Sequence, residues 1–161
     1  MPANAYHHVA LRVEDLDRST SFYEQVFGGS VVVELELDPE FVHSIFGGPE
    51  GSRGLNRVIS FGDWAIELFQ LEPGGPIPPT KQTEVGLMHF CVWTDDVAGT
   101  VELVKRAGGK ARFPIRPWQG KHFVYVEDVD GHVIELLDAT VAECSVMTKD
   151  GSVPDHTAEA V

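Results

Sequence analysis

The hydrophobic and polar residues of this chain follow one pattern that occurs twice. Residues 8–28 begin with the alternation of a half-buried strand, continue as an amphipathic helix that an aspartate can cap, and end at a glycine pair. Residues 89–109 repeat this order when His89 is aligned with His8. Such self-similarity over one supersecondary unit indicates a duplicated module.

Each copy continues into three further apolar segments, which predicts the order strand, helix and three strands. In both copies the last two strands are joined by a short turn containing glycine and aspartate, which is typical of a hairpin. The strands are expected near residues 7–13, 30–37, 54–61, 64–71, 86–94, 110–115, 121–127 and 132–138, and the helices near 17–27 and 97–107.

The first copy is longer because residues 38–51 are inserted between its second and third strands. Their proline and glycine content predicts a loop with a short helical turn at 40–46. We therefore expect an α+β fold of two tandem βαβββ modules whose curled mixed sheet surrounds a central cavity. The predicted divisions are a first module (5–72), a Pro/Gly-rich linker (73–85), a second module (86–140) and a lightly packed C-terminal tail (141–161).

The composition excludes several functions. Twelve basic against 25 acidic residues give a net charge of −13, and no Lys/Arg cluster offers the basic surface that nucleic acids require. A membrane span needs about 20 consecutive apolar residues, and the sequence contains no such run. The first residues lack the features of a signal peptide, and two distant cysteines favour a reducing compartment. A cytoplasmic location is therefore expected.

Two glutamates interrupt apolar strands at corresponding places. Glu67 lies within "WAIELF" and Glu135 within "HVIELL". Because side chains alternate along a strand, each glutamate can face away from the core while its apolar neighbours face into it. His8 and His89, near the start of the first strand of each module, are expected to face the same way. A lone histidine or glutamate in a strand is usually structural, but their recurrence in both copies favours a shared site.

The repeated stretches resemble the vicinal oxygen chelate superfamily, which includes glyoxalase I and methylmalonyl-CoA epimerase. The resemblance is carried by "HHVALRVEDLDRSTSFYEQVFGG", "WAIELFQ", "HFCVWTDDV" and "FVYVEDVDGHVIELLD". It implies paired βαβββ modules around a divalent metal ion. The family's metal positions fall on the first and last strands of each module, which here means His8, Glu67, His89 and Glu135.

Two imidazoles and two carboxylates suit a divalent ion such as Zn, Ni, Co or Mn. The resulting hypothesis is a metal-dependent lyase, isomerase or epimerase acting on a small carbonyl substrate. Glu67 or Glu135 would remove the proton alpha to the carbonyl, and the metal would stabilise the enolate. Four arginines are available for the carboxylates of glutathione without being diagnostic: Arg12, Arg53, Arg57 and Arg116. The acidic chain offers few basic residues for the phosphates of CoA, so a smaller or more apolar substrate is possible. Trp118, Phe123 and Tyr125 can form an aromatic pocket wall, and His122 is a candidate pocket residue.

Three alternatives remain open at this stage. An iron-dependent extradiol dioxygenase would use two histidines and one carboxylate, so Glu67 as a fourth ligand favours proton transfer instead. A thiol transferase that opens an epoxide also uses three protein ligands. A metal-free small-molecule or drug-binding protein of the same fold would need none of them. A homodimer is the expected assembly, because modules of this fold often pair between chains.

Overall fold

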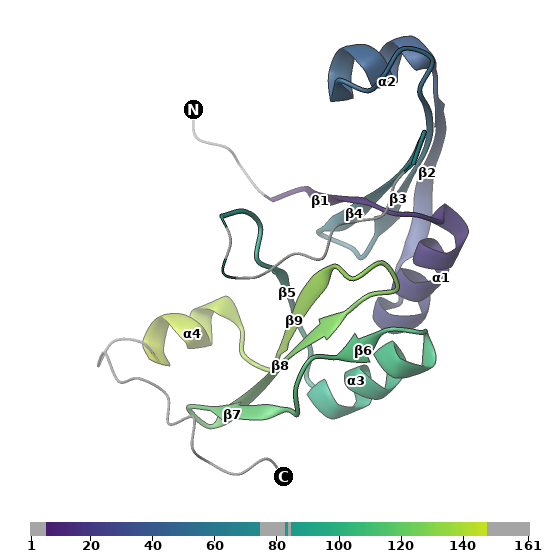
Figure 1. Ribbon diagram of the computed structural model, residues 1–161. Coiled ribbons are helices and arrows are strands. Elements are labelled where there is room, and N and C mark those ends of the chain that lie inside the picture. The colour runs from purple at the N-terminus through teal and green to yellow at the C-terminus, as the bar shows by residue number, and fades with distance from the viewer. Residues whose placement is uncertain (1–5, 75–82, 84, 148–161) are drawn as a thin grey trace. The chain divides into compact units, whose positions relative to one another are not determined.

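The computed structural model describes residues 6–74, 83 and 85–147. The chain divides into two compact units, Met1–Pro79 and Thr80–Val161, each with its own sheet. Figure 1 shows the elements of both units along the chain. In each unit the first strand pairs in parallel with the last strand, and the pairs that join the strands between them are antiparallel.

The first unit is a four-stranded mixed sheet with the strand order β1-β4-β3-β2. A helix, α1, lies between β1 and β2 in the sequence, and the insertion forms a second helix, α2. The elements are β1 (His8–Arg12), α1 (Leu16–Phe27), β2 (Ser30–Leu37), α2 (Pro39–Phe46), β3 (Arg53–Ser60) and β4 (Ala65–Glu72).

The second unit repeats this topology, with the order β5-β9-β8-β6 and a short additional strand, β7, paired with β8. Its elements are β5 (Phe90–Trp93), α3 (Val97–Arg106), β6 (Lys110–Ala111), β7 (Arg116–Trp118), β8 (Lys121–Glu127), β9 (Val133–Leu137) and α4 (Val141–Met147). The α+β class and the tandem βαβββ modules are therefore confirmed. The central cavity between the modules stays a prediction.

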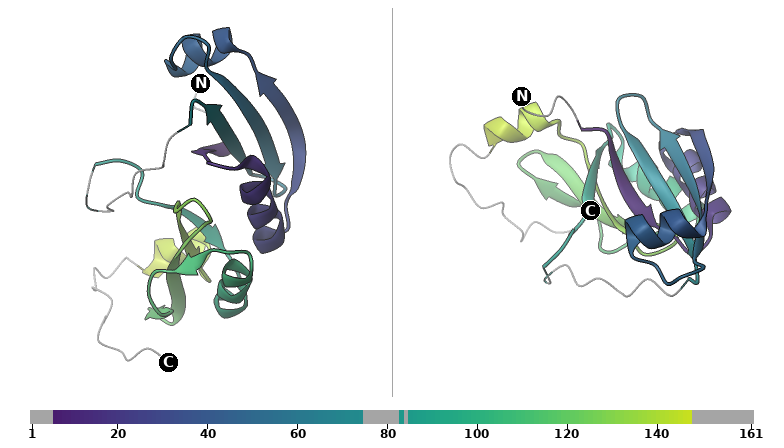
Figure 2. Two further views of the ribbon diagram at one scale, coloured as in Figure 1. Left: turned by 45° about the vertical axis from the view of Figure 1, so that its right-hand side comes forward. Right: turned by 90° about the horizontal axis from the view of Figure 1, so that it is seen from above.

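Each unit has its own core between one face of its sheet and one helix, as Figure 2 shows. In the first unit Phe22 and Tyr23 of α1 are almost completely buried, as are Ile66 and Leu68 of β4. Both helices begin as predicted, because Asp15 and Asp96 accept hydrogen bonds from backbone N–H groups three residues later. The second core is built by the corresponding residues Val97, Val101, Val104, Val124, Val126, Ile134 and Leu136.

The insertion forms a regular helix rather than a loop with one turn. Asp38 caps α2 by accepting a hydrogen bond from the N–H of Phe41, and Pro39 occupies a first-turn position where its missing N–H costs nothing. Gly47 ends the helix in the left-handed conformation, with φ of 67°. Asp38 and Pro39 are thus start signals of a helix, and Gly47 is a stop signal. The helix, Pro39–Phe46, is one residue longer than the turn predicted at 40–46.

Two predicted strands of the second unit are shorter than expected. The segment expected as one strand at 110–115 contains only β6, at Lys110–Ala111, and β7 begins at Arg116. Pro114 explains the break, because proline has no N–H to donate to a sheet. The strand expected at 86–94 contains only β5, Phe90–Trp93.

The predicted tail begins with a helix, α4, that the hydrophobic pattern did not indicate. The backbone N–H and hydroxyl of Thr140 both donate to the Glu143 carboxylate, and the N–H of Glu143 donates to the Thr140 hydroxyl. This is a capping box, whose T-x-x-E signature is present in the sequence. The rest of the expected tail, 148–161, lies outside the described residues.

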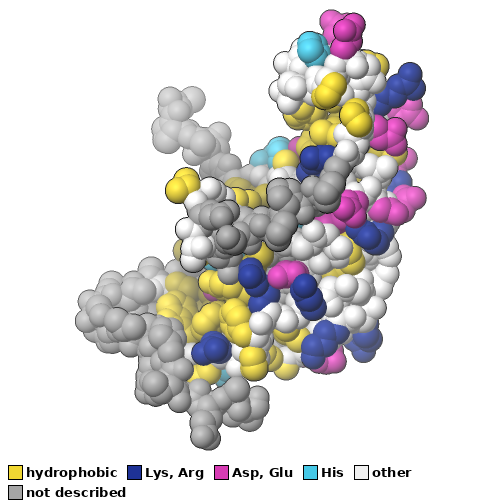
Figure 3. Space-filling model, viewed as in Figure 1, with side chains coloured by type: hydrophobic (Ala, Val, Ile, Leu, Met, Phe, Trp, Pro, Cys, Tyr) yellow, Lys and Arg dark blue, Asp and Glu magenta, His cyan; other side chains and the backbone are white. Residues whose placement is uncertain are grey.

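Charged side chains are interspersed on the surface. On the face seen in Figure 3, Lys and Arg side chains lie among Asp and Glu rather than in one continuous basic area. Within the described part of the chain, no helix is both long enough and apolar enough to cross a membrane.

The anchoring of α4 is expected to depend on pH. Lys121 and Thr140 hydrogen-bond to Glu143 and lower its pKa from 4.5 to about 2. A group whose pKa is lowered by folding stabilises the fold above its ordinary pKa, and this contribution disappears as pH falls through the folded value. The α-helical NMR chemical shifts of α4 should therefore persist from pH 7 to 4.5 and decline toward pH 2.

Glu143→Gln should weaken these helical shifts already at pH 7. The matched control is Glu102→Gln, which removes another exposed carboxylate, one that pairs with Lys105 on α3. If α4 shifts in Glu143→Gln are unchanged at pH 7, the capping role of Glu143 is wrong.

Candidate metal centre

Each unit brings one histidine and one glutamate into direct contact. In the first unit Nε2 of His8 lies 3.2 Å from Oε2 of Glu67. In the second unit Nε2 of His89 lies 3.2 Å from Oε2 of Glu135. The same two atoms therefore meet at the same separation in both modules, as the sequence repeat predicts for each pair.

The parallel pairing of the first and last strands produces both contacts. His8 lies opposite Ala65, and Glu67 follows two residues later on the same face of β4. In the second unit Phe90 lies opposite Ile134 and Cys91 opposite Glu135. Extending this register by one residue gives His89 the same diagonal relation to Glu135.

Strand alternation explains how the glutamates can lie within apolar runs. Ile66 and Leu68, the neighbours of Glu67, are fully buried, and so are Ile134 and Leu136 beside Glu135. The glutamate side chains lie on the opposite face and remain 22% and 20% exposed. Each pair is thus shielded by the sheet but still open to a ligand.

The chemistry of both pairs fits a divalent metal. Metal–nitrogen and metal–oxygen bonds of about 2.0–2.2 Å place neighbouring ligand atoms roughly 3 Å apart, close to the separation found in each pair. Nδ1 of His89 is buried without a hydrogen-bond partner, so no structural hydrogen bond holds that ring nitrogen. Nδ1 of His8 contacts Nδ1 of His7 at 2.8 Å, which leaves Nε2 directed at Glu67.

Each unit supplies two candidate ligands and no more. Across residues 6–74, 83 and 85–147, no three His, Cys, Asp or Glu side chains gather closely enough to hold a metal ion. The structure therefore brings together His8 with Glu67 and His89 with Glu135. A centre with all four ligands needs both pairs.

The pair in the first unit is bordered by an amide and by aromatic rings. Nδ2 of Asn56 on β3 donates to Oε1 of Glu67 and to the backbone carbonyl of Leu68, both at 3.1 Å. Phe69, on the same face of β4 as Glu67, packs edge-on against Phe46 of α2 with ring centroids 5.2 Å apart. Sequence analysis did not identify Asn56, because its partner lies on another strand.

The pair in the second unit has different neighbours. The ring of Tyr125 lies 4.9 Å from that of His89, and Phe113 and Phe123 extend the aromatic group. The aromatic pocket wall expected of Trp118, Phe123 and Tyr125 stays a prediction. Burial raises the pKa of the Cys91 thiol to about 12, and the charge and hydrogen bond of Glu135 contribute to this rise. The residue as a whole is exposed because β5 is an edge strand.

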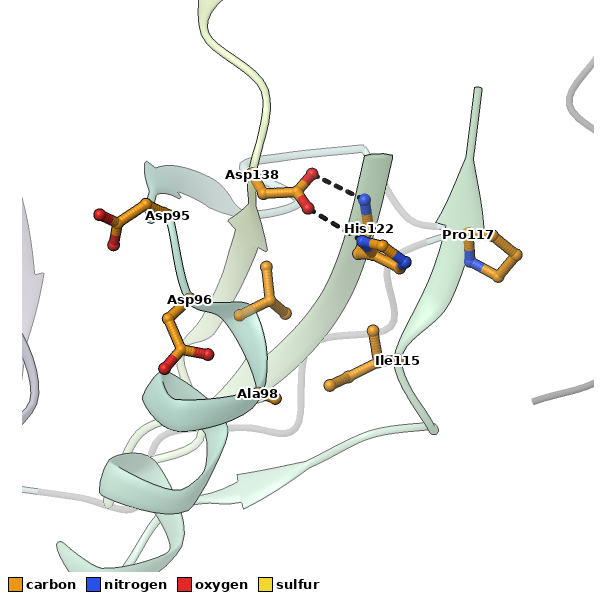
Figure 4. A pocket seen from close by; sticks show the side chains of 8 residues that line it. Asp95, Asp96, Ala98, Ile115, Pro117, His122 and Asp138 are labelled. Carbon is orange, nitrogen blue, oxygen red and sulfur yellow. Dashed lines mark hydrogen bonds and ion pairs between the residues drawn. The ribbon is translucent and has the colours of Figure 1, made fainter. Parts of the chain in front are cut away.

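A separate cavity of 360 Å³ lies in the second unit, and Figure 4 shows it from close by. His122 lines this cavity, as the sequence suggested for a pocket residue. Its N–H and Nδ1 contact the Asp138 carboxylate at 2.7 and 2.9 Å, while Asp96 caps α3. These carboxylates already have structural partners, and none of the four predicted ligands lines the cavity, so we do not regard it as the metal centre.

Comparison with known proteins identifies one family and several relatives. The model of the Glyoxalase/Bleomycin resistance protein/Dioxygenase superfamily matches residues 5–136. A probable chloroplastic lactoylglutathione lyase from Arabidopsis thaliana is 30% identical over 153 residues, covering 91% of this chain. The lactoylglutathione lyase of Haemophilus influenzae is 30% identical over 134 residues, covering 81% of this chain. This chain spans 40% of the Arabidopsis protein and 90% of the Haemophilus protein.

Solved structures share the fold at low identity. A glyoxalase family protein from Bacillus cereus superposes with a TM-score of 0.73 at 17% identity, covering 85% of this chain and 95% of that one. The fosfomycin resistance protein FosX from Listeria monocytogenes, solved with Mn(II) and sulfate, gives a TM-score of 0.61 at 20% identity and covers 90% and 99% of the two chains. At these identities the likeness concerns the fold alone.

The raised pKa of Cys91 predicts an unreactive thiol. At pH 8 a thiol with a pKa of about 12 is thiolate in only about one molecule in ten thousand, and the thiolate is the species that is alkylated. Iodoacetamide should therefore label Cys91 of chelator-treated protein far more slowly than it labels a free cysteine, as measured by peptide mass spectrometry.

Glu135→Gln should accelerate this labelling, because it removes a negative charge that disfavours the thiolate. The control is Glu102→Gln, which makes the same change on α3, where Glu102 pairs with Lys105, and should leave the Cys91 rate unaltered. Rapid labelling of Cys91 in the unaltered protein would contradict its raised pKa.

Proposed function

The chain belongs to the Glyoxalase/Bleomycin resistance protein/Dioxygenase superfamily, and we propose that it is a divalent-metal-dependent lyase or isomerase of the glyoxalase kind. The proposal is carried by one observation, the His–Glu contact that recurs with the same atoms and the same separation in both modules. The named relatives, two lactoylglutathione lyases at 30% identity, support this class of enzyme.

We propose that His8, Glu67, His89 and Glu135 together bind one divalent ion, taken from Zn, Ni, Co or Mn. Two imidazole nitrogens and two carboxylate oxygens are a suitable donor set for these ions. The two pairs can be contributed by one chain or by two chains of a homodimer, which is the assembly we propose. The bound ion would act as a Lewis acid that polarises the substrate's carbonyl group.

The carboxylates supply the proposed acid–base chemistry. The carboxylates of Glu67 and Glu135 stay partly exposed, and either can accept the proton on the carbon next to the substrate carbonyl. Returning a proton to the opposite face of the same carbon gives epimerisation, and returning it to the neighbouring carbon gives isomerisation. A positioned general base of this type contributes about 10²–10⁴-fold to the rate.

The neighbours of the pairs favour a carbonyl substrate with an apolar substituent. Phe69 and Phe46 border the first pair, and Tyr125 and Phe123 border the second. The relatives are named for lactoylglutathione, a thioester of a 2-hydroxy acid. We therefore propose 2-keto, 2-hydroxycarbonyl and thioester compounds as the substrate class, and a cytoplasmic location, in keeping with the free cysteines Cys91 and Cys144.

An iron-dependent dioxygenase is the main competing function within this superfamily. Its facial triad leaves one carboxylate out of the metal site. In this chain Glu67 and Glu135 make the same contact with their histidines, so the geometry does not mark either glutamate as the carboxylate outside the metal site. The repeated geometry therefore favours proton transfer.

Metal removal is expected to abolish activity. Purified protein incubated in heavy water with the proposed substrates should incorporate deuterium at the alpha carbon, as detected by NMR. Treatment with a chelator should lower this exchange by at least ~10²-fold, since the stabilisation of the developing charge is lost. Adding back Zn, Ni, Co or Mn should restore it.

Undiminished exchange after chelation would contradict the metal-dependent proposal. Oxygen consumption with a catechol, restored by iron but not by zinc or nickel, would instead establish the dioxygenase.

Glu135→Gln is expected to lower turnover by about 10²–10⁴-fold, because an amide cannot accept the proton. It should also reduce the bound metal, measured by elemental analysis, because a carboxylate ligand is lost. His122→Gln is the matched control, since His122 lines a separate cavity to which none of the four proposed ligands contributes. A metal-loaded Glu135→Gln protein with full activity would exclude Glu135 as the base.

A further inference from the structure

We propose that Asn56 is a positioning residue that holds the Glu67 carboxylate in place beside His8. This inference deepens the proposed function and rests on it. Asn56 places an amide at a buried position of the sheet where an apolar side chain would suffice.

Asn56 is buried in the first unit, with 2% of its surface exposed. It lies on β3 opposite Phe69, on the same face of the sheet as Glu67. Burying an amide is unfavourable unless its polar atoms are hydrogen-bonded. An apolar residue of similar size could fill this place without that requirement, so the amide needs a reason to be there.

The two hydrogen bonds of Asn56 provide that reason. Its Nδ2 donates to the carbonyl of Leu68 at 3.1 Å, and this bond ties the amide to the backbone of β4. The same nitrogen donates to Oε1 of Glu67 at 3.1 Å. Together the two hydrogen bonds hold the Glu67 carboxylate in a fixed orientation relative to the backbone of β4.

Both oxygens of Glu67 are consequently engaged in different ways. Oε1 is held by Asn56, and Oε2 faces Nε2 of His8 at 3.2 Å. A carboxylate fixed at one oxygen presents the other in a constant direction. Partners of this kind, one shell away from a metal ion, orient its ligands and raise its affinity.

The second unit lacks this amide. Asn56 lies opposite Phe69, two residues after Glu67, and the corresponding position opposite Leu137 is occupied by Phe123. A phenyl ring cannot donate a hydrogen bond to Glu135. Besides His89, the neighbours of Glu135 include the thiol of Cys91, which is a weak donor, and Tyr125, which lies opposite Glu135 on β8.

The duplicated pairs are therefore alike in their His–Glu contact and unlike in what supports it.

A double-mutant cycle in the metal-free protein tests the contact itself. Asn56→Leu, Glu67→Ala and the double variant are unfolded in urea in the presence of a chelator. If Asn56 holds Glu67, the effects of the two substitutions on the unfolding midpoint are not additive. The matched cycle uses Ile59→Ala, a fully buried β3 residue beside Gly29 on the helix-covered face, which should be additive with Glu67→Ala. Additivity in the Asn56 cycle would overturn the proposal.

Metal affinity tests the positioning role. In a competition titration with a chromophoric chelator, Asn56→Leu should bind Co(II) about 10–100-fold more weakly than the unaltered protein. Its Co(II) absorption spectrum should also change, because the geometry of a ligand has changed. Ile59→Ala destabilises the same strand and should leave both the affinity and the spectrum as they are.

The outcomes separate this inference from the proposed function. If the unaltered protein binds no Co(II), the metal-dependent function fails, and the positioning role toward the metal fails with it, while the urea cycle still reports the contact. If the unaltered protein binds Co(II) and Asn56→Leu binds it equally well, only the positioning role is overturned.

Discussion

The parallel pairing of the first and last strands of each module is the constraint on which the site depends. It places the residue at the start of one strand diagonally beside a residue in the middle of the other. His8 meets Glu67 within paired strands, and His89, which directly precedes β5, meets Glu135 in the same diagonal relation. A site built on paired strands is held more precisely than one built on loops.

Stability gives little reason to keep these pairs. Their side chains are 20–39% exposed, and ion pairs at partly exposed positions contribute about 0–1 kcal/mol. Apolar residues at the same places would extend the hydrophobic faces of β4 and β9. Both modules nevertheless place a polar His–Glu pair beside buried apolar residues. This arrangement is expected where residues serve a functional site rather than the packing of a core.

The sequence allowed much of this fold to be predicted, because periodicity and caps are local signals. The helices α1 and α3 and the hairpins before β4 and β9 follow from alternation and from Asp15 and Asp96. The helix α4 was missed although Thr140 and Glu143 form a capping box, since the short apolar pattern there was weak. Asn56 could not have been found, because its role depends on a contact across two strands. The convergence of the two pairs on one ion stays a prediction for the same reason.

The central claim is that both pairs bind one ion. X-ray absorption spectroscopy of the zinc-loaded protein, combined with its metal stoichiometry, tests this most directly. The account predicts one zinc per chain, with two imidazole nitrogens and two carboxylate oxygens among its nearest neighbours. Two zinc ions per chain, each with a single imidazole, would show that the pairs act separately and would contradict the account.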